Sequence, residues 1–257
     1  MILVDTHTHL YLEEFDEDRD EVVHAAIDAG VKYMLLPRID SESHEAQMAL
    51  SRQYPENCLS MAGLHPTSVK DDYGKELEVV EEELKKGIYK GVGEIGIDLY
   101  WDDTFKKEQE YVFRRQLQLA KAYKLPVSIH TRESFDVVYR IVKEEHNEDL
   151  TGVFHCFTGT HEEASLIMEL GFKMGIGGIL TFKNGGLAEV VKDIPMEYLV
   201  LETDSPFLTP VPYRGKRNQS KYVKYIAEKL AEIKEISIEQ VAEITTANAA
   251  ELFKLKI

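Results

Sequence analysis

The feature that most constrains the fold of this chain is a regular alternation of short apolar runs with helix-like segments along its length. Eight runs are typical of β-strands in length and composition; they cover residues 2–4, 32–36, 59–63, 91–95, 127–129, 152–154, 172–176 and 198–201. Strands that alternate with helices favour a parallel sheet. Eight such units in 257 residues predict an α/β protein with a (β/α)8 TIM barrel, formed as a single domain over residues 1–257.

Helix boundary signals support this alternation. Thr160 with Glu163 and Ser237 with Gln240 have the spacing of capping boxes, in which each side chain of the pair bonds the other residue's backbone N–H. The second box predicts an extra C-terminal helix beyond the eighth unit. A doubly wound open sheet is the competing architecture, but the glycine-rich stretch 175–178 lacks the dinucleotide-binding spacing that such a sheet often carries.

Residues of the kinds that bind metal ions follow or end these runs. A two-residue spacing places His7 and His9 on the same face of a strand, because side chains alternate between faces. A barrel gathers the ends of its strands at one face, so we expect one pocket with four imidazoles and two carboxylates. A lone buried histidine is more often a core residue than a ligand, but an ordered set of such residues is much stronger evidence for a metal site. The expected metal ligands are His7, His9, Glu94, His130, His155 and Asp204.

These ligands are suited to hydrolysis. Bound divalent ions lower the pKa of coordinated water, and two ions ~3.5–4 Å apart can share one attacking hydroxide. In a barrel, His7 and His9 would hold a first ion with Asp204, a second ion would lie on the other two histidines, and Glu94 would bridge both. Mixed histidine and carboxylate sites accept several ions, so the expected cofactors are two divalent metal ions, among them Mg, Mn, Zn or iron.

The net charge of −16 argues against a protein that holds nucleic acid through bulk electrostatics. A phosphate-bearing substrate must therefore meet local positive charge. Two divalent ions against Glu94 and Asp204 leave a surplus of about two positive charges. We expect the metal site to attract phosphate as well as to activate water.

Three further residues are expected to bind the substrate. Arg132 lies two residues after His130 and points into the same pocket if the strand continues, although a salt bridge to a nearby acid is the alternative. His65 could bind a phosphate, orient the attacking water, or be a structural loop residue. Arg214 belongs to the basic stretch 213–218, which could guide a nucleic-acid backbone or be a solvated loop.

Aromatic residues on neighbouring loops offer faces for nucleobases, or they pack the rim of the barrel. The candidates are Tyr100, Trp101, Phe157 and Phe207. Asp5 shares a strand face with His7 and could support the ligands, or it could cap a loop.

Several ordered motifs make the chain similar to the TatD family of metal-dependent deoxyribonucleases, which have amidohydrolase-like TIM barrels. The motifs are Asp5-Thr6-His7-Thr8-His9-Leu10, Gly63-Leu64-His65-Pro66, Gly93-Glu94-Ile95-Gly96-Ile97-Asp98, Ile129-His130-Thr131-Arg132, His155-Cys156-Phe157-Thr158-Gly159 and Leu201-Glu202-Thr203-Asp204-Ser205-Pro206. The resemblance spans almost the full length. It implies a two-metal site on the six ligands and hydrolysis of phosphodiester bonds in DNA, often from the 3′ end.

Two positions depart from the family's pattern. Paired tyrosines tend to follow the fourth-strand motif, where this chain has Leu99-Tyr100, and a late Asn-Glu-Pro tends to stand where it has Asn218-Gln219-Ser220. Neither change affects an expected metal ligand. These departures could affect substrate preference and the rigidity of the late loop, since proline fixes backbone shape.

The leading hypothesis is a metal-dependent phosphodiesterase acting on DNA, with DNA ends, single-stranded ones included, as substrate. Asp204 is the expected general base and Glu94 the metal-bridging catalytic residue. The alternative is a binuclear amidohydrolase or lactonase acting on a small carbonyl substrate. Such relatives often bridge their metals with a carboxylated lysine at the fourth strand. This chain has a glutamate there, which argues against the amidohydrolase or lactonase alternative without excluding it. A noncatalytic metal-binding or nucleic-acid-binding protein is the hypothesis from another class.

Localisation signals are few. Two distant cysteines, Cys58 and Cys156, suit a reducing compartment. The N-terminus lacks the basic flank and long apolar segment of a signal peptide, and no apolar run approaches membrane-spanning length. We expect a cytoplasmic protein without membrane association, and a monomer.

Overall fold

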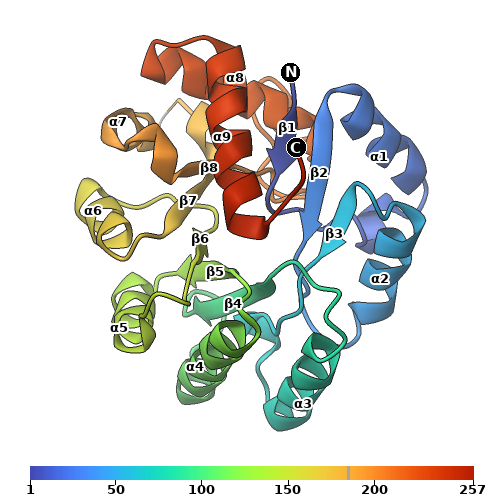
Figure 1. The fold of residues 1–257 in the computed structure, drawn as a ribbon, viewed down its shortest axis with the longest axis vertical. Helices are drawn as coiled ribbons and strands as arrows, with labels where there is room; N and C mark the ends of the chain where they lie inside the picture. Colours follow the sequence, from blue (N-terminus) through green and yellow to red (C-terminus); the bar gives the residue numbers. More distant parts are fainter. Residues whose placement is uncertain (184–185) are drawn as a thin grey trace.

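Eight parallel strands form the centre of the molecule in the computed structural model, which describes residues 1–183 and 186–257 (Figure 1). The strands are β1 (Leu3–Asp5), β2 (Val31–Leu36), β3 (Cys58–Ser60), β4 (Val92–Asp98), β5 (Val127–Arg132), β6 (Gly152–Phe154), β7 (Lys173–Ile176) and β8 (Leu199–Leu201). They pair in the orders β1-β2-β3 and β4-β5-β6-β7-β8. Parallel bridges Ala62↔Val92 and Thr8↔Ser205 join the two groups, so the sheet closes into the predicted barrel.

Helices surround the strands. They are α1 (Arg19–Asp28), α2 (His44–Gln53), α3 (Tyr73–Leu84), α4 (Lys106–Tyr123), α5 (Phe135–Glu145), α6 (His161–Glu169), α7 (Leu187–Asp193), α8 (Val223–Lys234) and α9 (Ile238–Phe253). Both predicted capping boxes are present, at the starts of α6 and α9. The short α7 was not anticipated from the sequence. Among the described residues no helix is long and apolar enough to cross a membrane.

Strands β4 and β5 are longer than the sequence indicated. The apolar runs were expected to end near residues 95 and 129, but hydrogen-bonded pairing continues to Asp98 and Arg132. Glu94 and His130 therefore lie inside their strands and not at the strand ends, which corrects the prediction for these two residues. The extension also fixes Arg132 on the pocket side of β5, two residues beyond His130.

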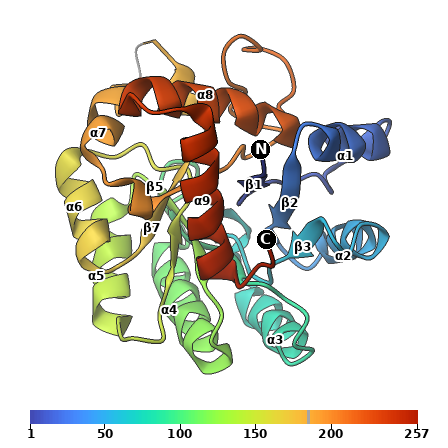
Figure 2. The same cartoon turned by 45° about the horizontal axis from the view of Figure 1, so that its top comes forward.

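Helix α9 closes the N-terminal end of the barrel. One apolar cluster joins side chains of the barrel interior, including Val4 and Val200, to Leu252 and Phe253 of α9. The Thr246 hydroxyl donates to the carbonyl of Ile2 (3.0 Å), at the residue that precedes β1. In Figures 1 and 2, α9 lies across the ring of strands, with both chain ends beside it. The extra C-terminal helix is thus a plug for the end of the barrel opposite the expected site.

Candidate metal centre

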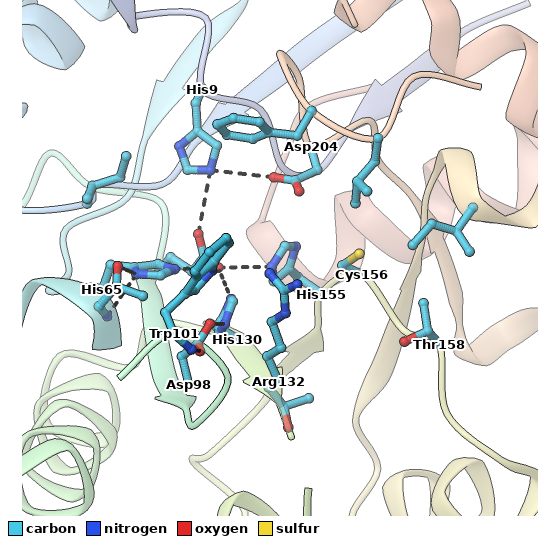
Figure 3. A pocket seen from close by; sticks show the side chains of 17 residues that line it. His9, His65, Asp98, Trp101, His130, Arg132, His155, Cys156, Thr158 and Asp204 are labelled. Carbon is cyan, nitrogen blue, oxygen red and sulfur yellow. Dashed lines mark hydrogen bonds and ion pairs between the residues drawn. The ribbon is translucent and has the colours of Figure 1, made fainter. Parts of the chain in front are cut away.

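The six expected ligands come together at the C-terminal end of the barrel. A cavity of about 660 Å³ is lined by five of them, and the sixth, His7, is fully buried and contacts Glu94. Each ligand comes from a different strand or strand end, apart from the His7 and His9 pair that follows β1. Figure 3 shows His9, His130, His155 and Asp204 around this cavity.

The two histidines after β1 direct their Nε2 atoms at one point. These atoms lie 3.2 Å apart, and Glu94 Oε2 is 3.1 Å from the His7 atom and 3.5 Å from the His9 atom. Behind His9, Nδ1 lies 2.9 Å from the hydroxyl of Tyr11, which donates its own hydrogen to the carbonyl of Pro37. His9 Nδ1 must therefore donate to Tyr11, which leaves the Nε2 lone pair facing the cavity.

The other two predicted histidine ligands surround the second oxygen of Glu94. Oε1 of Glu94 lies 2.8 Å from His130 Nδ1 and 2.9 Å from His155 Nε2. Each ring has a carboxylate behind it: His130 Nε2 is 2.8 Å from Asp98, and His155 Nδ1 is 3.4 Å from Glu202. Each ring therefore lies between two carboxylates, and the one behind it orients the ring, as the outer partners of metal-binding histidines usually do.

Asp98 and Glu202 are site residues that sequence reasoning did not assign. Glu94 and Asp98 are four residues apart on β4, so the period of two in a strand could have placed Asp98 on the same face. Glu202 is fully buried, and its Oε1 accepts the N–H of Cys156. Gly175 makes room for it, because a Cβ at that position would lie 2.0 Å from Glu202 Oε2.

Asp204 is aimed into the cavity by an unusual backbone turn. Its φ of 55° lies in the left-handed region, which aspartate tolerates better than most residues. Hydrogen bonds hold the turn: Asp204 N–H donates to the carbonyl of His7, and Phe207 N–H donates to the carbonyl of Asp204 (both 2.9 Å). Asp204 Oδ1 then lies 3.6 Å from His9 Nε2.

Burial and mutual charge shift the pKa values in this cluster. Burial raises the pKa of Asp204 to about 6 against the opposing effect of the nearby histidines. Burial would also raise the pKa of Glu94, but the surrounding histidines outweigh it and hold that pKa well below its ordinary value. Burial lowers the pKa of His7 well below its usual range, assisted by the charge of His155. Glu94 is thus kept anionic, and Asp204 changes charge near neutral pH.

The donor set fits divalent metal ions. Among the described residues, three groups have ligand atoms within 4.8 Å of one another: His7 with His9 and Glu94, His7 with His155 and Asp204, and His65 with Glu94 and His130. Imidazole nitrogens with bare lone pairs and anionic carboxylate oxygens are the ligands such ions prefer. The Nε2 atoms of His7 and His9 lie 3.2 Å apart, and the His7 ring stacks on the His155 ring with their centres 3.7 Å apart, so these ligands are closely grouped.

The residues predicted to bind the substrate lie in different places. Arg132 and His65 line the cavity. The guanidinium of Arg132 stacks 3.9 Å above the ring of Tyr100, which holds it at the edge of the cavity. Arg214 is not among the described residues that line the cavity; its guanidinium lies 3.7 Å from the centre of the Phe182 ring. In the same basic stretch, Arg217 is bound to Asp18.

The aromatic residues considered for base stacking also lie in different environments. Trp101 and Phe207 line the cavity with exposed fractions of 68% and 49%, and the Arg132 guanidinium lies 5.2 Å from the centre of the Trp101 ring. Phe157 is buried and packs in the core, which excludes the stacking role considered for it. Tyr100 is exposed but is covered on one face by Arg132.

Two other residues have structural roles at the ends of the strands. Asp5 accepts the N–H (2.9 Å) and the hydroxyl (2.6 Å) of Thr203, so it ties β1 to the end of β8 and touches no imidazole. Ser220, at the position where the family pattern has proline, donates to the hydroxyl of Thr8 (3.2 Å). That side-chain bond anchors the late loop next to the His7 and His9 segment.

Comparison with known proteins places this site in a family. A profile of TatD related DNases matches residues 4–254. The chain belongs to this family. It is 41% identical to the uncharacterized metal-dependent hydrolase YabD of Bacillus subtilis, covering 99% of this chain and 100% of that protein. It is 31% identical to the 3′-5′ ssDNA/RNA exonuclease TatD of Erwinia tasmaniensis, covering 98% of this chain and 100% of that protein.

A solved structure agrees with the barrel. The TatD homologue YjjV of Escherichia coli superposes with a TM-score of 0.91 at 28% identity, over 99% of this chain and 98% of that chain. The family resemblance inferred from the motifs is therefore confirmed, as is the TIM barrel. The protein is a metal-dependent hydrolase of the TatD family.

Proposed function

We propose that this hydrolase cleaves phosphodiester bonds of single-stranded DNA, as an exonuclease that removes nucleotides from the 3′ end. The observation that carries the proposal is the convergence of four histidines, Glu94 and Asp204 beside a cavity that also holds Arg132. The relative named as a 3′-5′ ssDNA/RNA exonuclease supports the choice of substrate and polarity.

In this proposal His7, His9, His130 and His155 hold two divalent ions together with the two carboxylates. Bound ions would lower the pKa of an attacking water and offset the charge on the phosphoryl oxygens. Glu94 is central because its two oxygens face different histidine pairs, Oε2 toward His7 and His9 and Oε1 toward the other two. Asp98 and Glu202 orient the rings of His130 and His155.

The reaction uses Asp204 as general base. Asp204 takes a proton from the attacking water, a new phosphorus–oxygen bond forms, and the bond from phosphorus to the 3′ oxygen of the shortened strand breaks. That oxygen then takes up the proton from Asp204, and the released nucleotide keeps the phosphate. A base works best when its pKa lies near the working pH, and burial raises the pKa of Asp204 to about 6. Arg132 binds a phosphate oxygen, since its planar guanidinium is always charged.

Single strands fit the entrance of the cavity better than duplex. Trp101 follows β4 and Phe207 follows β8, and strands four places apart in a ring of eight lie on opposite sides. Two exposed rings on opposite walls offer stacking faces to unpaired bases, and each such stack is worth about 1–3 kcal/mol. A paired base has its faces covered by its neighbours in the helix.

The test is cleavage of end-labelled oligonucleotides. Metal-loaded protein should shorten a 5′-labelled single strand stepwise, and the same sequence in a blunt duplex should be cleaved more slowly. A panel of lactone and amide substrates, assayed in parallel, tests the alternative of an amidohydrolase or lactonase. The proposal fails if no phosphodiester is cleaved with magnesium, manganese or zinc, or if Glu94→Ala protein cleaves as fast as the wild type.

A further inference from the structure

The hydrogen bond behind a histidine ring decides which nitrogen carries its hydrogen. Asp98 and Glu202 lie behind His130 and His155, and Glu94 Oε1 lies in front of both rings at 2.8 and 2.9 Å, so each ring has a carboxylate on both sides. Behind His9 the Tyr11 hydroxyl acts as an acceptor, so this ring donates backward and presents a bare nitrogen to the cavity. A bare nitrogen is what a metal ion requires.

His65 has the opposite arrangement. Its Nδ1 accepts the backbone N–H of Thr67 at 3.1 Å, and a backbone amide can only donate. The Thr67 hydroxyl lies 2.7 Å from the same nitrogen and can donate as well. Nδ1 is therefore the bare nitrogen, and in neutral His65 the hydrogen is on Nε2. Nε2 faces an acceptor, Glu94 Oε1, at 3.4 Å.

The local sequence produces this arrangement. His65 caps the short 3-10 helix η2 (Pro66–Ser68), with its side chain in the position of an N-terminal cap. Pro66 has no N–H, so the first N–H that this turn can offer belongs to Thr67. The His-Pro-Thr order thus locks the ring by a backbone bond and does not depend on any distant residue.

The consequence is a distinction within the site. The ligand atoms of His65, Glu94 and His130 lie within 4.8 Å of one another, as they would around a third ion. A nitrogen that carries hydrogen cannot coordinate a metal, so the tautomer argues against that use. What His65 presents instead is an N–H donor at the wall of the cavity, at the edge of the ligand cluster (Figure 3).

We propose that the Nε2–H of His65 donates a hydrogen bond to a non-bridging oxygen of the phosphate bound in the cavity, and that His65 is not a metal ligand. This inference rests on the proposed function, because it takes phosphate as the group that enters. A fixed donor aimed at the phosphoryl oxygens stabilises the charge that builds on them in the transition state.

The experiment compares wild type, His65→Ala and His65→Gln in metal-loaded protein, with His24→Ala on α1 as a control for a histidine outside the cavity. Elemental analysis measures bound metal, and calorimetry measures the affinity for inorganic phosphate. We expect unchanged metal content in every variant. Phosphate affinity should fall about 10- to 100-fold in His65→Ala, the range for losing a hydrogen bond to a charged group. His65→Gln should recover part of it, because its amide offers an N–H.

Loss of a metal equivalent in His65→Ala would overturn the proposal, as would unchanged phosphate affinity. The wild-type protein provides a readout that needs no variant to fold: nitrogen NMR of labelled histidine should show His65 with its hydrogen on Nε2, and a hydrogen on Nδ1 would contradict the proposal. These measurements need no DNA. If they hold while DNA is not cleaved, the nuclease proposal fails alone; if DNA is cleaved, His65→Ala should lower kcat/KM about 100-fold.

Discussion

The two ends of the barrel differ in chemistry although the same strands build both. At the N-terminal end, Val4 of β1 and Val200 of β8 pack against α9 in an apolar cluster. At the C-terminal end, the residues that follow the same two strands include His9 and Asp204, which line the cavity that holds the expected metal ligands. This fold therefore separates stability from chemistry along the length of each strand. Substitutions at the two ends should therefore have opposite signatures.

The largest effect should come from Glu94→Gln at the cavity end. Glutamine keeps the shape of the side chain but removes the charge that faces both histidine pairs. Loss of a residue that only supports a metal ligand costs up to about 100-fold in activity. Glu94 is itself an expected ligand, so phosphodiesterase activity should fall by more than that. The melting temperature should change little. Steady-state rates and thermal unfolding measure the two quantities, with Glu239→Gln on the exposed start of α9 as a matched control. Retained activity would show that Glu94 is not central.

Phe253→Ala should give the reverse signature at the plugged end. Phe253 is buried against the bottom of the barrel, and truncation of a buried phenylalanine costs about 3–5 kcal/mol of unfolding free energy. Urea unfolding measures this loss. The kcat of the protein that remains folded should match the wild type; a fall in kcat without a loss of stability would break the separation of the two ends.

Asp98→Asn tests the support of a single expected ligand, His130, at the cavity end. Asparagine can no longer accept the His130 hydrogen as a charged partner, so the ring loses the carboxylate that orients it. The expected cost is about 10- to 100-fold in metal affinity or activity. Metal titration of the stripped protein checks it, and Asp149→Asn on the exposed loop before β6 is the control. Equal metal affinity and activity in both variants would assign Asp98 a purely structural role.

The pH dependence of activity should be the smallest of these effects near neutral pH. Asp204 must be unprotonated to accept a proton, and burial raises its pKa to about 6. The active form is therefore present above that pKa and is lost as the pH falls through it, with activity declining about tenfold per pH unit further down. Bound cations would move the midpoint lower. A kcat/KM profile flat from pH 7 down to pH 4 would contradict the role of Asp204.

Much of this division could be predicted from the sequence. The alternation of strand-like and helical segments predicts the barrel, and the barrel in turn predicts that His7, His155 and Asp204 meet, because each follows a strand. Local signals were sufficient for the capping boxes of α6 and α9. Each of these inferences uses only residue order and the period of one element.

Contacts across the barrel could not be predicted in the same way. The sequence gives no sign that β5 extends to Arg132, because the polar residues at its end pair with β4 through backbone bonds that are independent of hydropathy. The position of Arg214 on Phe182 depends on how two loops meet. The roles of Asp98 and Glu202 depend on which ring each carboxylate reaches. Whether the chain acts as one domain and as a monomer stays a prediction.

The central claim is that the cavity end holds two divalent ions that drive phosphodiester cleavage. The most direct measurement is a titration of chelator-stripped protein with manganese, in which bound metal and cleavage of an end-labelled single strand are followed in the same samples. Cleavage should rise with bound metal and level off at about two equivalents per chain. Saturation of the site with metal while the DNA stays intact would contradict it.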